Sequence, residues 1–122
     1  MIEGALIGES MRVGAELDAA PLVVRTIGRQ AWGDTSAGQP EVWTVIEFEA
    51  DERDAAVLAG GLAKALSADC GWYADFRTPA ETFVVFAGRV FRYPRGDGAG
   101  RAEAAGYGRS MGVPQSQLDW PA

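Results

Sequence analysis

Acidic, basic and aromatic side chains alternate along three consecutive strand-like runs, residues 71–78, 81–87 and 89–93. Because successive side chains of a strand point to opposite sides of the sheet, Tyr73, Asp75 and Arg77 fall on one face. A carboxylate such as Asp75 or Glu47 can act as a general acid or base, and the guanidinium of Arg77 can clamp an anion. The alternative is that Asp75, Arg77, Glu47 and Glu49 form cross-strand ion pairs at the rim of a sheet.

Turn chemistry predicts how the three runs pair. With Pro79-Ala80 and Ala87-Gly88 at the centres of two tight turns, Phe76 lies opposite Phe83 and Val85 lies opposite Val90. One face is then an ordinary core surface with Trp72, Ala74, Phe76, Phe83, Val85 and Val90. The other face carries Tyr73, Asp75, Arg77, Val84, Phe86, Arg89, Phe91 and Tyr93.

The second face is too aromatic to be left in water. A sheet with one solvated face usually alternates apolar with polar residues, yet four aromatic rings lie on this one. We therefore expect it to be covered by a helix, by the C-terminal tail with Trp120, by a ligand or by a second copy of the chain. The candidate residues for binding a ligand or partner are Tyr73, Asp75, Arg77, Phe86, Phe91 and Tyr93.

Three functions fit these residues. The first is a non-catalytic interaction or regulatory protein that forms a homodimer through the aromatic face. The second is a small-molecule-binding protein, or an enzyme, with a pocket that uses Asp75 and Arg77. The third is an acidic immunity-type protein that neutralises a basic partner, because 17 acidic residues against 11 basic ones give a net charge of −6. The same charge disfavours binding to nucleic acid.

The residue types that are missing restrict the chemistry. The sequence has no histidine, so the common zinc sites and imidazole-based catalysis are not expected, and neither a cofactor nor a metal is predicted. The single cysteine, Cys70, cannot form an internal disulfide and suits a small buried position. No apolar run is long enough for a membrane span, and the acidic Glu3 is unlike a secretory signal, so we expect a cytoplasmic protein. The scarcity of catalytic residue types favours a protein that is not an enzyme.

A glycine-rich stretch, 94-PRGDGAG-100, lies between a strand-like and a helix-like run, which is a context for phosphate binding. The residues do not complete a nucleotide-binding motif, because Arg101 stands where the third glycine of G-x-G-x-x-G would be. An adhesive role of the Arg-Gly-Asp tripeptide does not suit a cytoplasmic protein. We interpret the stretch as a turn, with Asp97 as the N-cap of the following helix.

The wider pattern predicts the elements that position these residues. The chain length and the 48% hydrophobic content favour a single globular domain over residues 1–122. Strands are expected near 3–9, 21–31, 42–50, 71–78, 81–87 and 89–93, and helices near 52–68 and 99–111. This βββα-βββα order predicts an α+β fold whose mostly antiparallel sheet carries both helices on one face, partly ferredoxin-like, with 117–120 as a possible last strand.

The segments GWYADFRT, ETFVVFAGRVFRYPRGD and GVPQSQLDWP resemble a family of small uncharacterised bacterial proteins. The resemblance covers about the last third to half of the chain. It implies a stand-alone bacterial domain and brings no activity, cofactor or site residue with it.

Overall fold

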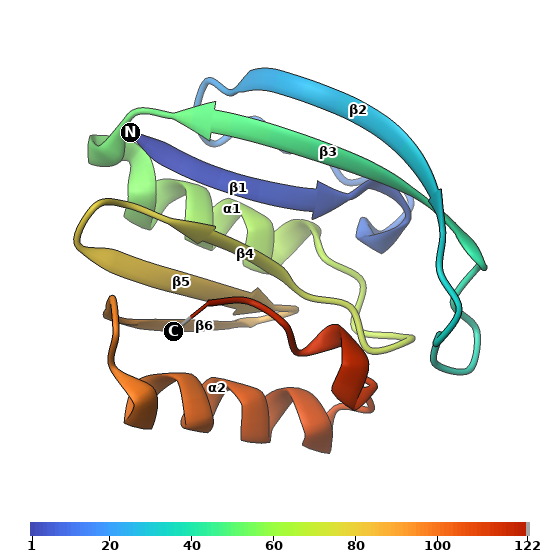
Figure 1. Ribbon diagram of the computed structural model, residues 1–122. Helices are drawn as coiled ribbons and strands as arrows, with labels where there is room; N and C mark the ends of the chain where they lie inside the picture. The colour runs from blue at the N-terminus through green and yellow to red at the C-terminus, as the bar shows by residue number, and fades with distance from the viewer. Residues whose placement is uncertain (122) are drawn as a thin grey trace.

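The computed structural model of the chain describes residues 1–121. Six strands form one antiparallel sheet in the order β2-β3-β1-β4-β5-β6 (Figure 1). The strands are β1 (Ile2–Ile7), β2 (Val23–Ala31), β3 (Val42–Ala50), β4 (Ala74–Arg77), β5 (Glu81–Phe86) and β6 (Arg89–Pro94). Helix α1 (Ala55–Ala65) follows β3, and helix α2 (Gly98–Ser110) follows β6. The α+β class and the predicted order of elements are confirmed.

The pairing of β4, β5 and β6 follows the predicted register. Phe76 lies opposite Phe83, and Val85 lies opposite Val90. Strand β4 begins at Ala74, however, and not at Gly71 as predicted. Trp72 therefore lies outside the ladder, and its predicted place on the core face was wrong because strand alternation does not extend back to it.

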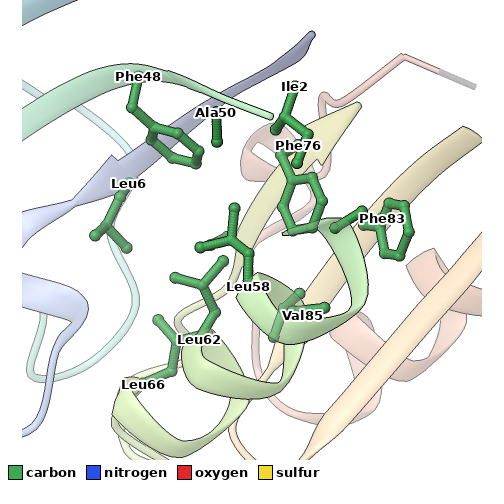
Figure 2. Packing of buried hydrophobic residues seen from close by; sticks show 13 residues of the cluster. Ile2, Leu6, Phe48, Ala50, Leu58, Leu62, Leu66, Phe76, Phe83 and Val85 are labelled. Atoms are coloured by element: carbon green, nitrogen blue, oxygen red, sulfur yellow. The ribbon is translucent and has the colours of Figure 1, made fainter. Parts of the chain in front are cut away.

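The main core lies between the sheet and α1. Asp51 accepts a hydrogen bond from the backbone N–H of Arg53 at 3.0 Å and caps a short 3-10 turn, Glu52–Asp54, that leads into α1. The helix then buries Leu58 and Leu62 at the four-residue spacing of one helix face. Figure 2 shows Leu58 next to Phe76 of β4, with Leu62 further along the helix toward Leu66.

The two helices lie on opposite faces of the sheet, which corrects the prediction that both pack on one face. Phe83 and Val85 of β5 point into the core under α1. Val84 and Phe86 point the other way, into a second core. That core is completed by α2 and the tail (residues 113–121) with Phe91, Tyr93, Ala104, Ala105, Val113, Leu118 and Trp120. Since both faces of β5 are apolar, each face needs its own cover.

The partial ferredoxin-like prediction was also wrong. That arrangement ends in a strand and has both helices on one face of the sheet, whereas residues 117–120 are not a strand here. A 3-10 turn, Gln115–Gln117, starts the last segment, and Leu118 and Trp120 are buried as irregular chain. Packing of these side chains against α2 and the sheet takes the place of strand pairing.

The glycine-rich stretch forms the turn from β6 into α2, and Asp97 is the N-cap of α2, as predicted. Asp97 accepts hydrogen bonds from the backbone N–H groups of Ala99 at 3.1 Å and Gly100 at 3.2 Å. Gly100 allows the helix to approach β6, because a Cβ atom there would lie 2.6 Å from Cβ of Tyr93. The carboxylate of Asp97 therefore already accepts hydrogen bonds from the backbone N–H groups that a bound phosphate would need.

Candidate functional site

The second core covers only part of its sheet face. The remaining part, on β1, β2 and β3, borders two adjoining cavities. The first, here the aromatic cavity, has a volume of about 220 Å³ and is lined by the strands, by the tail and by the segment before β4. The second, here the polar cavity, has a volume of about 380 Å³. Ala5 and Asp75 line both cavities, so these two residues mark their boundary.

Three tryptophans from distant parts of the chain meet in the wall of the aromatic cavity. The rings of Trp32 and Trp43 are stacked with centroids 4.9 Å apart, and the ring of Trp72 meets Trp43 edge-on at 5.1 Å. The indole N–H of Trp43 donates to the carbonyl of Pro40 at 2.7 Å, which fixes the ring orientation. Trp43 and Trp72 are buried, whereas Trp32 is only half-buried.

A hydrogen-bonded network holds the rim of this cavity. Gln117 is buried, and its amide N–H groups donate to the carbonyl of Asp34 at 2.7 Å and to Oε1 of Gln39 at 3.0 Å. Gln39 in turn donates to the carbonyl of Cys70 at 2.7 Å. The loop between β2 and β3 is therefore attached to the tail. Buried amides that are paired in this way hold the rim in one geometry.

Cys70 belongs to this rim and is half-buried, a less enclosed position than the predicted one. Its φ of 69° lies in the left-handed region, which is uncommon for a residue with a side chain. Ser36 Oγ and the amide of Gln39 both donate to the carbonyl of Cys70. These bonds hold the backbone of Cys70 in the turn, so its role is to shape the rim.

Asp75 is the most perturbed acid at the site. Burial raises the pKa of its carboxyl to about 6, the positive charge of Arg77 opposes the shift, and the negative charge of Asp119 adds to it. Among residues 1–121, no hydrogen bond or ion pair is made to this carboxylate. Asp75 is half-buried, and a partly desolvated carboxylate that receives no hydrogen bond is unfavourable. Groups with shifted pKa values of this kind are concentrated at functional sites.

Tyr73 separates Asp75 from the tail. Its hydroxyl donates to the carbonyl of Gln117 and lies 3.2 Å from Oδ1 of Asp119. Burial raises the pKa of Tyr73, and the charges of Asp75 and Asp119 raise it further. The phenol therefore stays protonated and acts as a hydrogen-bond donor to the tail.

Arg77 lies in the polar cavity, beyond Asp75 along β4. That cavity contains two guanidinium and four carboxylate side chains, from Glu3, Arg25, Glu47, Glu49, Asp75 and Arg77. Within the described chain, Arg25 and Glu49 form the only ion pair of the six, at 3.7 Å. The alternative of cross-strand ion pairing therefore holds for Glu49, which pairs with Arg25 of the neighbouring strand, but not for Asp75, Arg77 or Glu47. Glu47 is exposed and accepts a hydrogen bond from Thr26 Oγ1 at 2.8 Å.

The structure divides the six predicted site residues into two groups. Tyr73 and Asp75 border the aromatic cavity, and Arg77 borders the adjoining polar one. Phe86, Phe91 and Tyr93 are buried in the second core, under α2 and the tail. Their predicted role as a binding surface is corrected, because a partner could reach them only by displacing this cover.

Sequence reasoning named the tail as a possible cover but missed that the tail and three tryptophans line a cavity. Trp32 and Trp43 come from the hairpin of β2 and β3, and Gln117 and Asp119 come from the tail. The available signal was the presence of four tryptophans in 122 residues. This number points to aromatic clusters without saying which rings meet.

Comparisons with protein-family models, with curated proteins and with solved structures gave no match to this chain. Within residues 1–121, neither helix combines the length and the apolar character that a membrane crossing requires. The same residues contain no group of three or more Asp, Glu or Cys side chains arranged to hold a metal ion. The candidate site therefore has to be interpreted from its own geometry.

Proposed function

We propose that the protein binds a small organic molecule in the aromatic cavity, with Asp75 as the polar anchor. The observation that carries this proposal is the half-buried carboxylate of Asp75, which lines a cavity walled by aromatic rings and receives no hydrogen bond from residues 1–121. Ligand sites typically combine apolar and aromatic walls with a few polar groups that fix orientation. Burying this charge is unfavourable for the free protein, and a bound ligand would offset part of that cost.

This proposal agrees with the second sequence-based hypothesis but places the pocket elsewhere on the sheet face. The pocket lies beside the second core, with tryptophans of the β2–β3 hairpin in place of Phe86 and Phe91. Arg77, the predicted anion clamp, faces the polar cavity and can reach only a ligand that extends past Asp75. A carboxyl with a pKa near 6 can also exchange a proton with a bound molecule at physiological pH.

A cavity-blocking substitution tests the binding function. Ala5 lies between Glu47 and Asp75 in the sheet and borders both cavities, so the larger side chain of Ala5→Leu fills the boundary between them. In a screen of chemically diverse small molecules by ligand-observed NMR, we expect hits that bind the wild type at least about tenfold more tightly than Ala5→Leu. The matched control is Ala102→Leu on the exposed side of α2, where affinity should not change. Hits that bind Ala5→Leu as well as the wild type would contradict the proposal.

A second candidate function is self-association through the edge strand β2. Within residues 1–121 this strand pairs only with β3, so its outer row of backbone N–H and C=O groups has no strand partner there. Val24 and Ile27 lie on the same face because a bulge intervenes, and they are 49% and 68% exposed. We propose that a second copy pairs antiparallel along β2, since pairing of identical strands in this way has the two-fold symmetry of common dimers. This retains the predicted homodimer but changes its surface.

A charge placed on β2 tests the dimer. We expect a dimer of the wild type in sedimentation velocity at micromolar concentration, and a rise of about tenfold or more in the dimer dissociation constant for Ile27→Lys. Val57→Lys is the control, because Val57 is 54% exposed on α1, away from the edge strand. A monomeric wild type, or equal weakening by both substitutions, would rule out this interface.

A further inference from the structure

The charges around the aromatic cavity indicate which class of ligand it takes. Asp75 and Asp119 line the cavity, and no lysine or arginine of the described chain does. We propose that the ligand is a small organic cation, an amine or quaternary ammonium group carried on an apolar or aromatic body. This inference rests on the proposed binding function and adds the charge and shape of the ligand to it.

The tryptophan rings of the cavity lack a cation that other aromatic rings of this protein have. The guanidinium of Arg89 lies 4.8 Å from the centroid of Phe91, and that of Arg101 lies 5.2 Å from Trp120. In the described part of the chain, no such cation stands over Trp32, Trp43 or Trp72. Indole is the aromatic side chain that attracts cations most strongly. A ligand ammonium group can occupy the place that arginine takes elsewhere.

The carboxylate of Asp75 favours the same ligand charge. An anionic ligand would be repelled by both Asp75 and Asp119, and a neutral ligand could donate a hydrogen bond to Asp75 but would not balance its charge. A cation gains a charge-assisted hydrogen bond to this carboxylate while its apolar body contacts the tryptophan wall. The side chains of Ala5, Ile7 and Val45, from β1 and β3, supply an apolar surface for the body of the ligand.

Binding of a cation should weaken in acid, because protonation removes the charge of Asp75. The pKa of Asp75 is about 6 because burial raises it, the charge of Arg77 lowers it and the charge of Asp119 raises it. Ionisable groups face Asp75 from its own strand, from the tail and from the neighbouring strands, namely Tyr73, Arg77, Asp119, Glu3, Glu47, Glu49 and Arg25. With that pKa, only about a tenth of the sites carry the ionised carboxylate at about pH 5, so affinity should fall about tenfold from its value above pH 7.

Three probes of similar shape separate charge from apolar contact: 2-phenylethylamine, 2-phenylethanol and 3-phenylpropionate. NMR titration at about pH 7.5 should give an affinity for the amine that is at least about tenfold above those of the alcohol and the carboxylate. Asp75→Asn should lower the affinity for the amine to that for the alcohol and leave the alcohol unchanged. Asp18→Asn, an exposed aspartate in the loop between β1 and β2, is the control and should change neither.

The outcomes distinguish the ligand class from the binding function. If the alcohol or the carboxylate binds as well as the amine, and binding still depends on Ala5, the inference is overturned while the proposed function stands. If the amine binds equally to Ala5→Leu and to the wild type, both are overturned. Absence of amine binding at millimolar concentration overturns the inference, and the screen of diverse molecules then decides the function separately.

Discussion

Asp75→Asn is expected to raise the free energy of unfolding at about pH 8 by about 1–3 kcal/mol. The direction is the opposite of that for most substitutions, which destabilise. Its physical cause is the partial burial of a carboxylate that receives no hydrogen bond from residues 1–121, which raises the pKa of Asp75 to about 6. That value lies about two above the pKa of an aspartate in an unfolded chain, and each unit corresponds to about 1.4 kcal/mol.

The pH dependence has a definite sign. Between about pH 4 and pH 6 the native Asp75 holds its proton while the unfolded one has released it, so the stability of the wild type falls as the pH rises through this range. Above about pH 6 the full cost of the buried charge is present. Below about pH 4 both states are protonated, and the advantage of Asp75→Asn should disappear.

Urea denaturation of the wild type and Asp75→Asn at about pH 4, 6 and 8 measures this effect. The difference in stability should grow with pH and level off near pH 8. Asp18→Asn provides the matched control, and we expect it to change stability by less than about 0.5 kcal/mol. A difference between wild type and Asp75→Asn that is constant with pH, or a loss of stability at pH 8, would mean that the Asp75 carboxylate has an unseen partner in the free protein.

A stabilising substitution at this position would also support a functional role for the native residue. Proteins retain unfavourable groups where activity requires them, and exchange stability for function at such sites. The experiment with Asp75→Asn therefore links the two properties: one substitution should increase stability and reduce affinity for an organic cation. A purely structural aspartate would not be expected to do both.

The strands and their pairing could be predicted because the signals are local. Alternation places Phe76 and Phe83 on one face, and the tight turns at Pro79-Ala80 and Ala87-Gly88 set the register that the structure has. The same alternation correctly placed Asp75 and Arg77 on one face of the sheet, whereas Tyr73 lies just before β4. A short turn leaves the two strands it joins few alternative registers, so the local sequence determines the pairing of β4, β5 and β6.

The cover of the second face could not be predicted in the same way. Helix α2 turns small residues, Ala104, Ala105 and Gly108, toward the sheet, and these give a weak apolar pattern. A Cβ atom on Gly108 would lie 2.9 Å from the side chain of Leu118, so the small residue allows close packing. Small residues permit this approach but do not show in advance which face the helix will choose.

The aromatic cavity depends on contacts between residues far apart in sequence. Strand β1 lies between β3 and β4, which places Trp43 and Asp75 on the same open face, separated by one strand. Nothing in the local pattern of either strand indicates this neighbour. The same holds for Trp32, because its stacking on Trp43 requires the β2–β3 pairing and the closure of a loop.

The second large effect is expected for Trp120→Ala, which should lower the free energy of unfolding by about 3–5 kcal/mol. Trp120 is 2% exposed, and its indole N–H donates to the hydroxyl of Tyr93 at 2.9 Å. Its ring meets Tyr73 edge-on at 5.0 Å, and Arg101 donates to its carbonyl at 3.0 Å. Removing the ring leaves a void and an unpaired hydroxyl in the second core.

Thermal and urea unfolding of Trp120→Ala and Trp120→Phe separate the two contributions. Trp120→Phe keeps an apolar ring but loses the bond to Tyr93, so we expect a smaller loss of about 1–2 kcal/mol. Because Tyr73 and Asp119 join this tail to the aromatic cavity, Trp120→Ala should also weaken ligand binding and expose Phe86 and Phe91 to an apolar dye. A loss below about 1 kcal/mol for Trp120→Ala would show that the tail is not the cover of this face, and the aromatic surface would again be available to a partner.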